Sequence, residues 1–120
     1  FHDTNNRSTI INNSTIIGNV ASHQGGGIYM SGASPTITNV VISNNFAQDL
    51  GAGAFVDDVS YPIFSNVTFA NNTVIEPDST HGGGAIACYH GGGPIVNNSI
   101  YVLLFFLREE FPVSASLLFS

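Results

Sequence analysis

The chain has 120 residues, enough for one domain at most, and a formal net charge of −6 at pH 7. Only 8% of its residues are charged, and its two cationic side chains, Arg7 and Arg108, stand against eight carboxylates. This composition excludes a nucleic-acid-binding protein and a basic membrane anchor, because both require clustered cations facing phosphates.

One sequence pattern occurs four times along the chain. It is clearest where PTITNVVISNN at 35–45 is followed by PIFSNVTFANN at 62–72, with a degenerate copy at 9–19 and a further start at Pro94. Aligning the copies gives apolar columns (Ile11, Ile37, Phe64, Val96; Ile16, Ile42, Phe69, Tyr101) and asparagine columns (Asn13, Asn39, Asn66, Asn98; Asn19, Asn45, Asn72). The intervals in the column of Asn13 are 26, 27 and 32 residues, which indicates a solenoid of stacked units.

In chain order, residues 1–8 are polar and are expected to be a frayed segment or the end of a preceding coil. Because the sequence begins without methionine or an apolar leader, we expect a processed product or an excised fragment. Residues 9–100 form the repeated coils, with a strand expected at 28–30 after a glycine cluster. The longest loop, at 74–81, is where an outward contact would be placed.

The repeat breaks after Ile100, and residues 101–120 are predominantly apolar. We expect this segment to cap the open end of the stack or to contact another subunit, through Tyr101, Leu103, Phe105, Phe106 and Phe111. Its first seven residues are all apolar, but about 20 are needed to span a bilayer. No membrane span is therefore predicted.

Apolar and polar residues alternate within each copy, as at Val40 and Ile42 or at Val67 and Phe69. This is the period of a strand and not of a helix. Short strands, fixed turns and one repeat length together predict an all-β parallel β-helix, a solenoid of about three to four coils. Like residues then stack at about 4.8 Å. The apolar columns become core, the asparagine columns become amide ladders with left-handed backbone, and the glycines form tight turns.

Two motifs in the third copy resemble a known family of repeats. Phe69-x-x-Asn72 and Gly83-Gly84-Ala85-Ile86 are similar to the FxxN and GGA(I/L/V) motifs of polymorphic outer-membrane protein repeats in chlamydia-like autotransporters. Similar repeats occur in secreted β-helical proteins of the pectate-lyase-like superfamily. The resemblance covers about residues 8–100 and implies a right-handed parallel β-helix. It leaves activity open, since such coils serve adhesins, fibre shafts and carbohydrate-active enzymes alike.

The adjacent acids Asp57 and Asp58 are the obvious catalytic candidates. Asp49 is nearby, and His90 in YHGG resembles the Gly-His-Gly motif of polygalacturonase-like enzymes, which act on acidic polysaccharides. A glycosidase needs two carboxyl groups held at a set separation, whereas neighbouring strand residues point to opposite faces. We therefore interpret Asp57 and Asp58 as a solvated turn and predict that the protein is not an enzyme.

No metal or cofactor is predicted either. His23 and His81 align with Leu50 between them, two coils and about 10 Å apart, which is too far for one ion with ligands near 2 Å. Glu76 and Asp78 could bind Ca²⁺ weakly, but such a pair is more often only solvated.

The single cysteine, Cys88, excludes an intrachain disulfide framework and a thiolate metal cluster. Free cysteines are among the most frequently buried residues. We expect Cys88 to be a small core side chain beside the glycines at 83 and 84.

Sequons for N-glycosylation begin at Asn6, Asn12, Asn13, Asn66, Asn71 and Asn97, which favours a secreted or cell-surface protein. Asn71 and Asn97 precede the ladder columns and are expected to point outward more readily than Asn66. A ladder without sugar remains the alternative.

These observations predict a structural protein, a β-helical subunit or segment of an extracellular fibre or surface protein. Its partners would be further coils of a longer chain or copies of itself added end to end. Glycans are a second class of expected partner. The alternatives are an adhesin passenger segment and a carbohydrate-binding or carbohydrate-cleaving β-helix.

Overall fold

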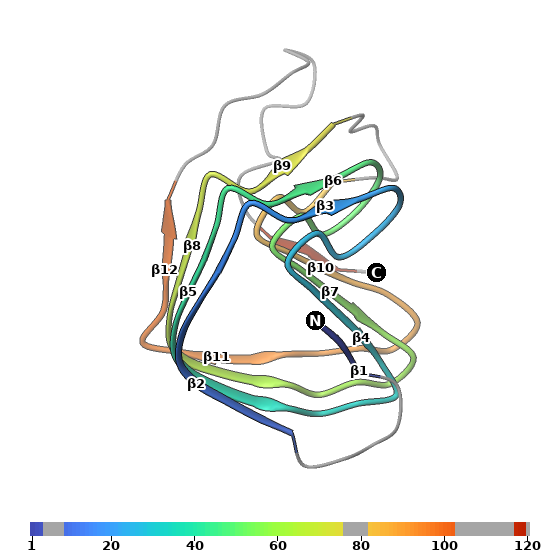
Figure 1. Cartoon of the computed structure of the whole chain (residues 1–120). Helices are drawn as coiled ribbons and strands as arrows, with labels where there is room; N and C mark the ends of the chain where they lie inside the picture. The colour runs from blue at the N-terminus through green and yellow to red at the C-terminus, as the bar shows by residue number, and fades with distance from the viewer. Residues whose placement is uncertain (4–8, 76–81, 103–116, 120) are drawn as a thin grey trace.

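The structure is a computed structural model, and it describes residues 1–3, 9–75, 82–102 and 117–119 (Figure 1). Strands are the only regular elements in these residues. They are β1 (His2–Asp3), β2 (Ile10–Ile17), β3 (Val20–Ala21), β4 (Ile28–Ser31), β5 (Thr36–Ser43), β6 (Phe46–Ala47), β7 (Ala54–Asp57), β8 (Ile63–Ala70), β9 (Thr73–Val74), β10 (Ile86–Cys88), β11 (Ile95–Asn97), β12 (Ile100–Val102) and β13 (Leu117–Phe119). No helix in the described part of the chain has the length and apolar character to cross a membrane.

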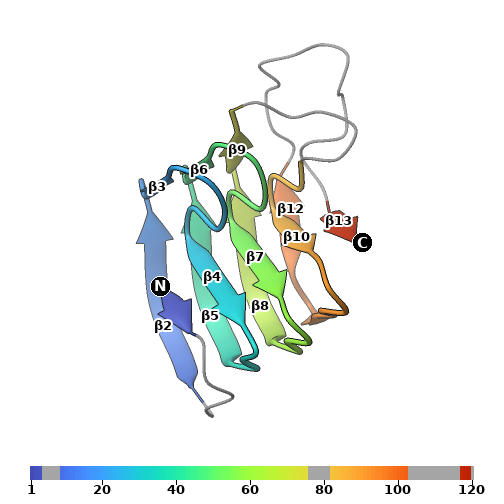
Figure 2. The ribbon, with the colours of Figure 1, turned by 90° about the vertical axis from the view of Figure 1, so that its right-hand side faces the viewer.

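The strands form three parallel sheets that enclose one core. Sheet A has the order β1-β4-β7-β10-β13, sheet B contains β2, β5, β8, β11 and β12, and sheet C has the order β3-β6-β9. Figure 1 looks along the stack and shows each coil passing through the sheets in turn. Figure 2 shows successive coils side by side. The predicted parallel β-helix is confirmed.

The strand register reproduces the predicted apolar columns. Ile11, Ile37, Phe64 and Val96 are paired in succession along sheet B, as are Ile16, Ile42, Phe69 and Tyr101. Side chains one coil apart in the repeat therefore stack directly over one another. Ile37, Ile42, Phe64 and Phe69 are all at most 1% exposed.

The first asparagine column turns the corner of sheet B. Asn13, Asn39, Asn66 and Asn98 have φ between 49° and 59°, a left-handed conformation that asparagine tolerates better than most residues. Their amides form an exposed ladder, in which Asn39 Nδ2 donates to Asn13 Oδ1 (3.2 Å) and Asn66 Nδ2 donates to Asn39 Oδ1 (2.7 Å). In the last coil the corner separates β11 from β12, and both pair with β8.

The second asparagine column works differently, and its members Asn45 and Asn72 are buried while Asn19, in the first coil, is exposed. Asn45 Oδ1 accepts from the backbone N–H and the amide of Asn19, and Asn72 Oδ1 accepts from the same two groups of Asn45. The expected left-handed backbone is not in this column. It lies one residue earlier, at Gly18, Asn44 and Asn71. Asn45 and Asn72 therefore serve as buried hydrogen-bonding groups that connect one coil to the next.

The core lies between sheets A and B. Phe64 and Phe69 meet edge to face, with ring centroids 5.4 Å apart. Cys88 is fully buried in the same cluster, as predicted, and burial raises the pKa of its thiol to about 12. A thiol with this pKa remains protonated at neutral pH, so Cys88 acts as a small apolar side chain.

Both ends of the described chain add strands to sheet A. β1 pairs with β4, so the first residues occupy the place of a strand from a preceding coil. β13 pairs with β10 and continues the sheet at the other end. Leu103, Phe105, Phe106 and Phe111 lie outside the described residues, and the predicted cap stays a prediction.

Candidate functional site

The candidate site lies where the strands of sheet A end. β7 ends at Asp57, Asp58 follows it, and His90 comes two residues after β10 in the next coil. His90 Nδ1 lies 2.5 Å from Asp57 Oδ1, and Ser31 Oγ donates to Asp58 Oδ2 over 2.8 Å. One ligand atom from each of Asp57, Asp58 and His90 lies within 4.8 Å of the other two. The site thus combines two carboxylates with an imidazole.

The expectation that Asp57 and Asp58 face opposite sides was wrong. The alternation rule applies within a strand, but Asp58 lies beyond the end of β7 and has φ of 48°. This left-handed residue, together with Val59 (φ 56°), reverses the chain and brings both carboxylates to one side. Asp58 does lie in an exposed turn, as expected, whereas Asp57 is the last residue of β7 and its side chain is only 14% exposed.

The electrostatics of the site follow from this geometry. The hydrogen bond from His90 to Asp57 raises the pKa of the imidazole, and the negative charges of Asp57 and Asp58 act in the same direction. Tyr29, on β4, also has a raised pKa, first because of burial and then because of the same two carboxylates. The site therefore favours the protonated forms of His90 and Tyr29.

The His90–Asp57 pair predicts a pH-dependent contribution to stability. Because the folded-state pKa of His90 is raised, the contribution is complete below the unfolded-state pKa of about 6.5 and is lost as pH rises through the folded-state pKa. We expect His90→Gln to lower the melting temperature at about pH 5.5 and to have less effect at about pH 8.5. Circular dichroism melts with a chelator present measure this, and a destabilisation that grows with pH would contradict it.

A second histidine–aspartate pair corrects the predicted alignment of His23. The bridges Gln24↔Leu50 and Leu50↔Gly82 place Asp49, and not Leu50, in the column of His23. His23 Nδ1 lies 3.3 Å from Asp49 Oδ2, with the imidazole 80% exposed. Asp49 thus belongs to this pair and not to the site at Asp57. His81, Glu76, Asp78, Arg7 and Arg108 lie outside the described residues.

The candidate glycosylation sites within the described residues are all exposed. Asn12, Asn13, Asn66, Asn71 and Asn97 each present their side chains at the surface, and Asn6 lies outside the described residues. Asn13 and Asn66 differ from the others in that their amides take part in the corner ladder, where Asn13 Oδ1 accepts from Asn39 and Asn66 Nδ2 donates to Asn39. Glycosylation itself stays a prediction.

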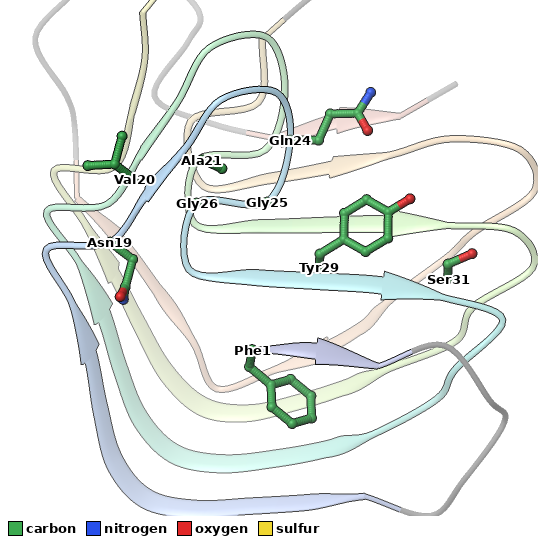
Figure 3. A pocket seen from close by; sticks show the side chains of 9 residues that line it. All are labelled: Phe1, Asn19, Val20, Ala21, Gln24, Gly25, Gly26, Tyr29 and Ser31. Atoms are coloured by element: carbon green, nitrogen blue, oxygen red, sulfur yellow. The ribbon is translucent and has the colours of Figure 1, made fainter.

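An open hollow of about 570 Å³ lies at the N-terminal end of the stack. Phe1, Tyr29 and Ser31 line it from sheet A, and Asn19, Val20 and Gln24 line it from the region of β3 (Figure 3). Phe1 is 51% and Val20 72% exposed. The hollow lies on the outer surface of the first coil, at the N-terminal end of the stack.

Sequence reasoning did not place Ser31 and Tyr29 beside Asp57 and Asp58. The spacing of these residues from the glycines in each coil could have indicated that Ser31 lies there. Gly25, Gly51 and Gly83 all have left-handed φ (67°, 58°, 69°) and mark the same point in each coil. Ser31 and Asp57 lie six residues after the glycine of their coil, and Asp58 and His90 lie seven residues after theirs. Aligning on the glycines would have brought the cluster together.

The fold identifies this protein as a parallel β-helix. Its defining features are the three parallel sheets, the stacked side-chain columns and the left-handed asparagine corners. Residues 1–100 match the family model described as right-handed β-helix region, and the chain belongs to this family. No curated protein and no solved structure matches the chain.

Proposed function

We propose that the protein is a structural β-helical unit of an extracellular fibre or surface protein, extended by further coils at its ends. The observation that carries this proposal is the uncovered outer face of the first coil. Ile37 and Ile42 are fully buried, whereas Ile11 and Ile16, in the same columns, are only half-buried. Among the described residues, the first coil therefore presents partly solvated core side chains and an edge of β2 that pairs with no strand, and a further coil would cover both.

The last coil offers a matching surface. Val96 stands in the column of Ile11, and it too is only half-buried against the core. A coil placed against either end would continue the same apolar columns and the strand pairing of sheet B. Such head-to-tail contacts do not close on themselves, so they extend a chain or build a fibre. We infer that further coils of a longer chain or copies of this chain supply them.

Two other features support a secreted surface protein. The FxxN and GGAI segments resemble polymorphic outer-membrane protein repeats, and the sequons within the described residues begin at exposed asparagines. We propose on these grounds that the chain is exported, and we propose further that it is not an enzyme. Glycans at Asn12, Asn71 and Asn97 would project from the coils without disturbing the hydrogen bonds described here.

Sedimentation velocity and electron microscopy over a range of concentrations test the assembly. We expect the chain to form head-to-tail oligomers, and we expect Ile16→Lys to suppress them because it places a charge on the end face. Val41→Lys is the matched control, because Val41 is 40% exposed on the central strand β5. A monodisperse 12.6 kDa monomer at high concentration would refute self-assembly.

A carbohydrate-cleaving function is the second candidate, favoured by the cluster of Asp57, Asp58 and His90. Ligand oxygens of its two carboxyl groups lie within 4.8 Å, closer to the ~5 Å spacing of retaining glycosidases than to the ~6.5–9.5 Å of inverting ones. Incubation with acidic and neutral polysaccharides tests this candidate. Turnover that is lost in Asp57→Asn and Asp58→Asn would support it, and no turnover on any substrate would favour the structural function.

A further inference from the structure

We propose that Asp57, Asp58 and His90 bind one zinc ion at the end of sheet A. The turn after β7 supplies the two carboxylates, and the turn after β10 supplies the imidazole from the next coil. This site depends neither on the end-to-end assembly of chains nor on hydrolysis of a polysaccharide.

The stacking of two coils creates the site. The backbone N–H of Val59 donates to the carbonyl of His90 (3.2 Å), which fixes one turn against the other. His90 itself has a left-handed φ of 46°, as do Asp58 and Val59. Both turns are thus held by their backbone conformations and by the hydrogen bond between them, which brings the three ligands together.

The separations between ligand atoms suit one small cation. Zinc lies about 2.0–2.2 Å from imidazole nitrogen and carboxylate oxygen, so its ligand atoms are roughly 3–4 Å from one another. In the cluster all three ligand atoms lie within 4.8 Å of one another. His90 Nδ1 and Asp57 Oδ1 are 2.5 Å apart, so zinc would replace their hydrogen bond and move these two atoms apart by about 1 Å.

The chemistry of the ligands favours zinc over calcium. Calcium takes six to eight oxygen ligands, whereas zinc accepts imidazole nitrogen with carboxylate oxygen in a set of four. Ser31 Oγ donates to Asp58 Oδ2, and an outer hydrogen bond of this kind orients a metal-binding carboxylate. Three protein ligands leave a fourth position for water, which the 72% exposed His90 side chain keeps accessible.

Charge balance points in the same direction. Asp57 and Asp58 are adjacent in the sequence, and like charges at this spacing repel. Neither lysine nor arginine occurs in the ranges that the structure describes, because Arg7 and Arg108 lie outside them. His90 is therefore the sole side chain with a possible positive charge that is paired with these carboxylates in the described contacts, and a divalent cation would neutralise both.

Isothermal titration calorimetry of the chelator-treated chain with ZnCl₂ tests the proposal. We expect one saturable site per chain, a higher melting temperature with zinc, and at least a 10-fold loss of affinity in His90→Gln and in Asp58→Asn. A parallel titration with CaCl₂ should show weaker binding. Unchanged circular dichroism of both variants would show that the coils remain folded.

His23→Gln is the matched control, because His23 also faces an aspartate but has one carboxylate instead of two. Its zinc affinity should equal that of the parent chain. The proposal is overturned if the parent chain shows no saturable binding, if His90→Gln binds zinc as tightly as the parent, or if His23→Gln loses as much affinity as His90→Gln. None of these outcomes depends on assembly or on hydrolytic activity.

Discussion

Replacing Phe69 by alanine is expected to lower the free energy of unfolding by about 4 kcal/mol. Phe69 is 1% exposed, its ring meets Phe64 edge to face at 5.4 Å, and it lies on β8, an interior strand of sheet B. Coils on both sides hold the surrounding side chains in register, so the cavity cannot readily collapse. Domains of this size have total stabilities of about 5–15 kcal/mol. The loss is therefore a large fraction of the total.

Chemical denaturation followed by circular dichroism measures this effect. Thr68→Ala is the matched control, since Thr68 precedes Phe69 on β8 and is partly exposed, and we expect it to change stability by less than about 1 kcal/mol. Phe69→Leu should lie between the two and keeps the comparison measurable if Phe69→Ala does not fold. A Phe69→Ala variant as stable as Thr68→Ala would show that this column is not the core.

The sequence predicted the stacking because a solenoid is determined by local repetition. Each apolar column of sheet B could be read from spacing alone, since residues one coil apart are paired in register. The sequence did not predict which asparagine column would be buried. Asn66 and Asn72 stand in equally regular columns, yet only the corner column takes the left-handed conformation. That difference arises from the path of the turn and not from residue type.

The Phe-x-x-Asn motif of one coil lies against a glycine of the preceding coil, a relation that spacing alone does not show. A Cβ added to Gly53 would lie 2.4 Å from the carbonyl oxygen of Ala85, 3.0 Å from the Phe69 ring and 3.2 Å from the amide of Asn72. Gly27 has the same relation to Ile42 and Asn45. The glycine is required because the next coil's core side chain and buried amide both approach its backbone.

The candidate site could be predicted less well, for a related reason. Its residues lie in turns, where strand alternation no longer decides which way a side chain points. Asp57 and Asp58 converge because Asp58 adopts a left-handed conformation, which is uncommon for residues other than glycine and asparagine. The register offset that paired His23 with Asp49 came from coils of unequal length. A single-residue error in a turn changes the partner completely.

Replacing Asn72 by alanine is expected to lower the free energy of unfolding by about 3 kcal/mol, although it removes only a small polar side chain. Asn72 Oδ1 accepts from the backbone N–H (3.1 Å) and the amide (3.0 Å) of Asn45, and Asn72 Nδ2 donates to the carbonyl of Ile42 (2.8 Å). All three partners are buried, so water cannot replace the lost bonds. Each buried polar group that loses its partner costs about 1–3 kcal/mol.

Asn12→Ala is the control, because Asn12 is exposed on β2 and should change stability by less than about 0.5 kcal/mol. Asn72→Ala also keeps the sequon that begins at Asn71, so a glycosylated chain can be compared with its parent directly. Amide hydrogen exchange adds a local measurement, since the N–H of Asn45 loses its acceptor and should exchange faster. If Asn72→Ala and Asn12→Ala were equally stable, the buried amides would not be what holds successive coils together.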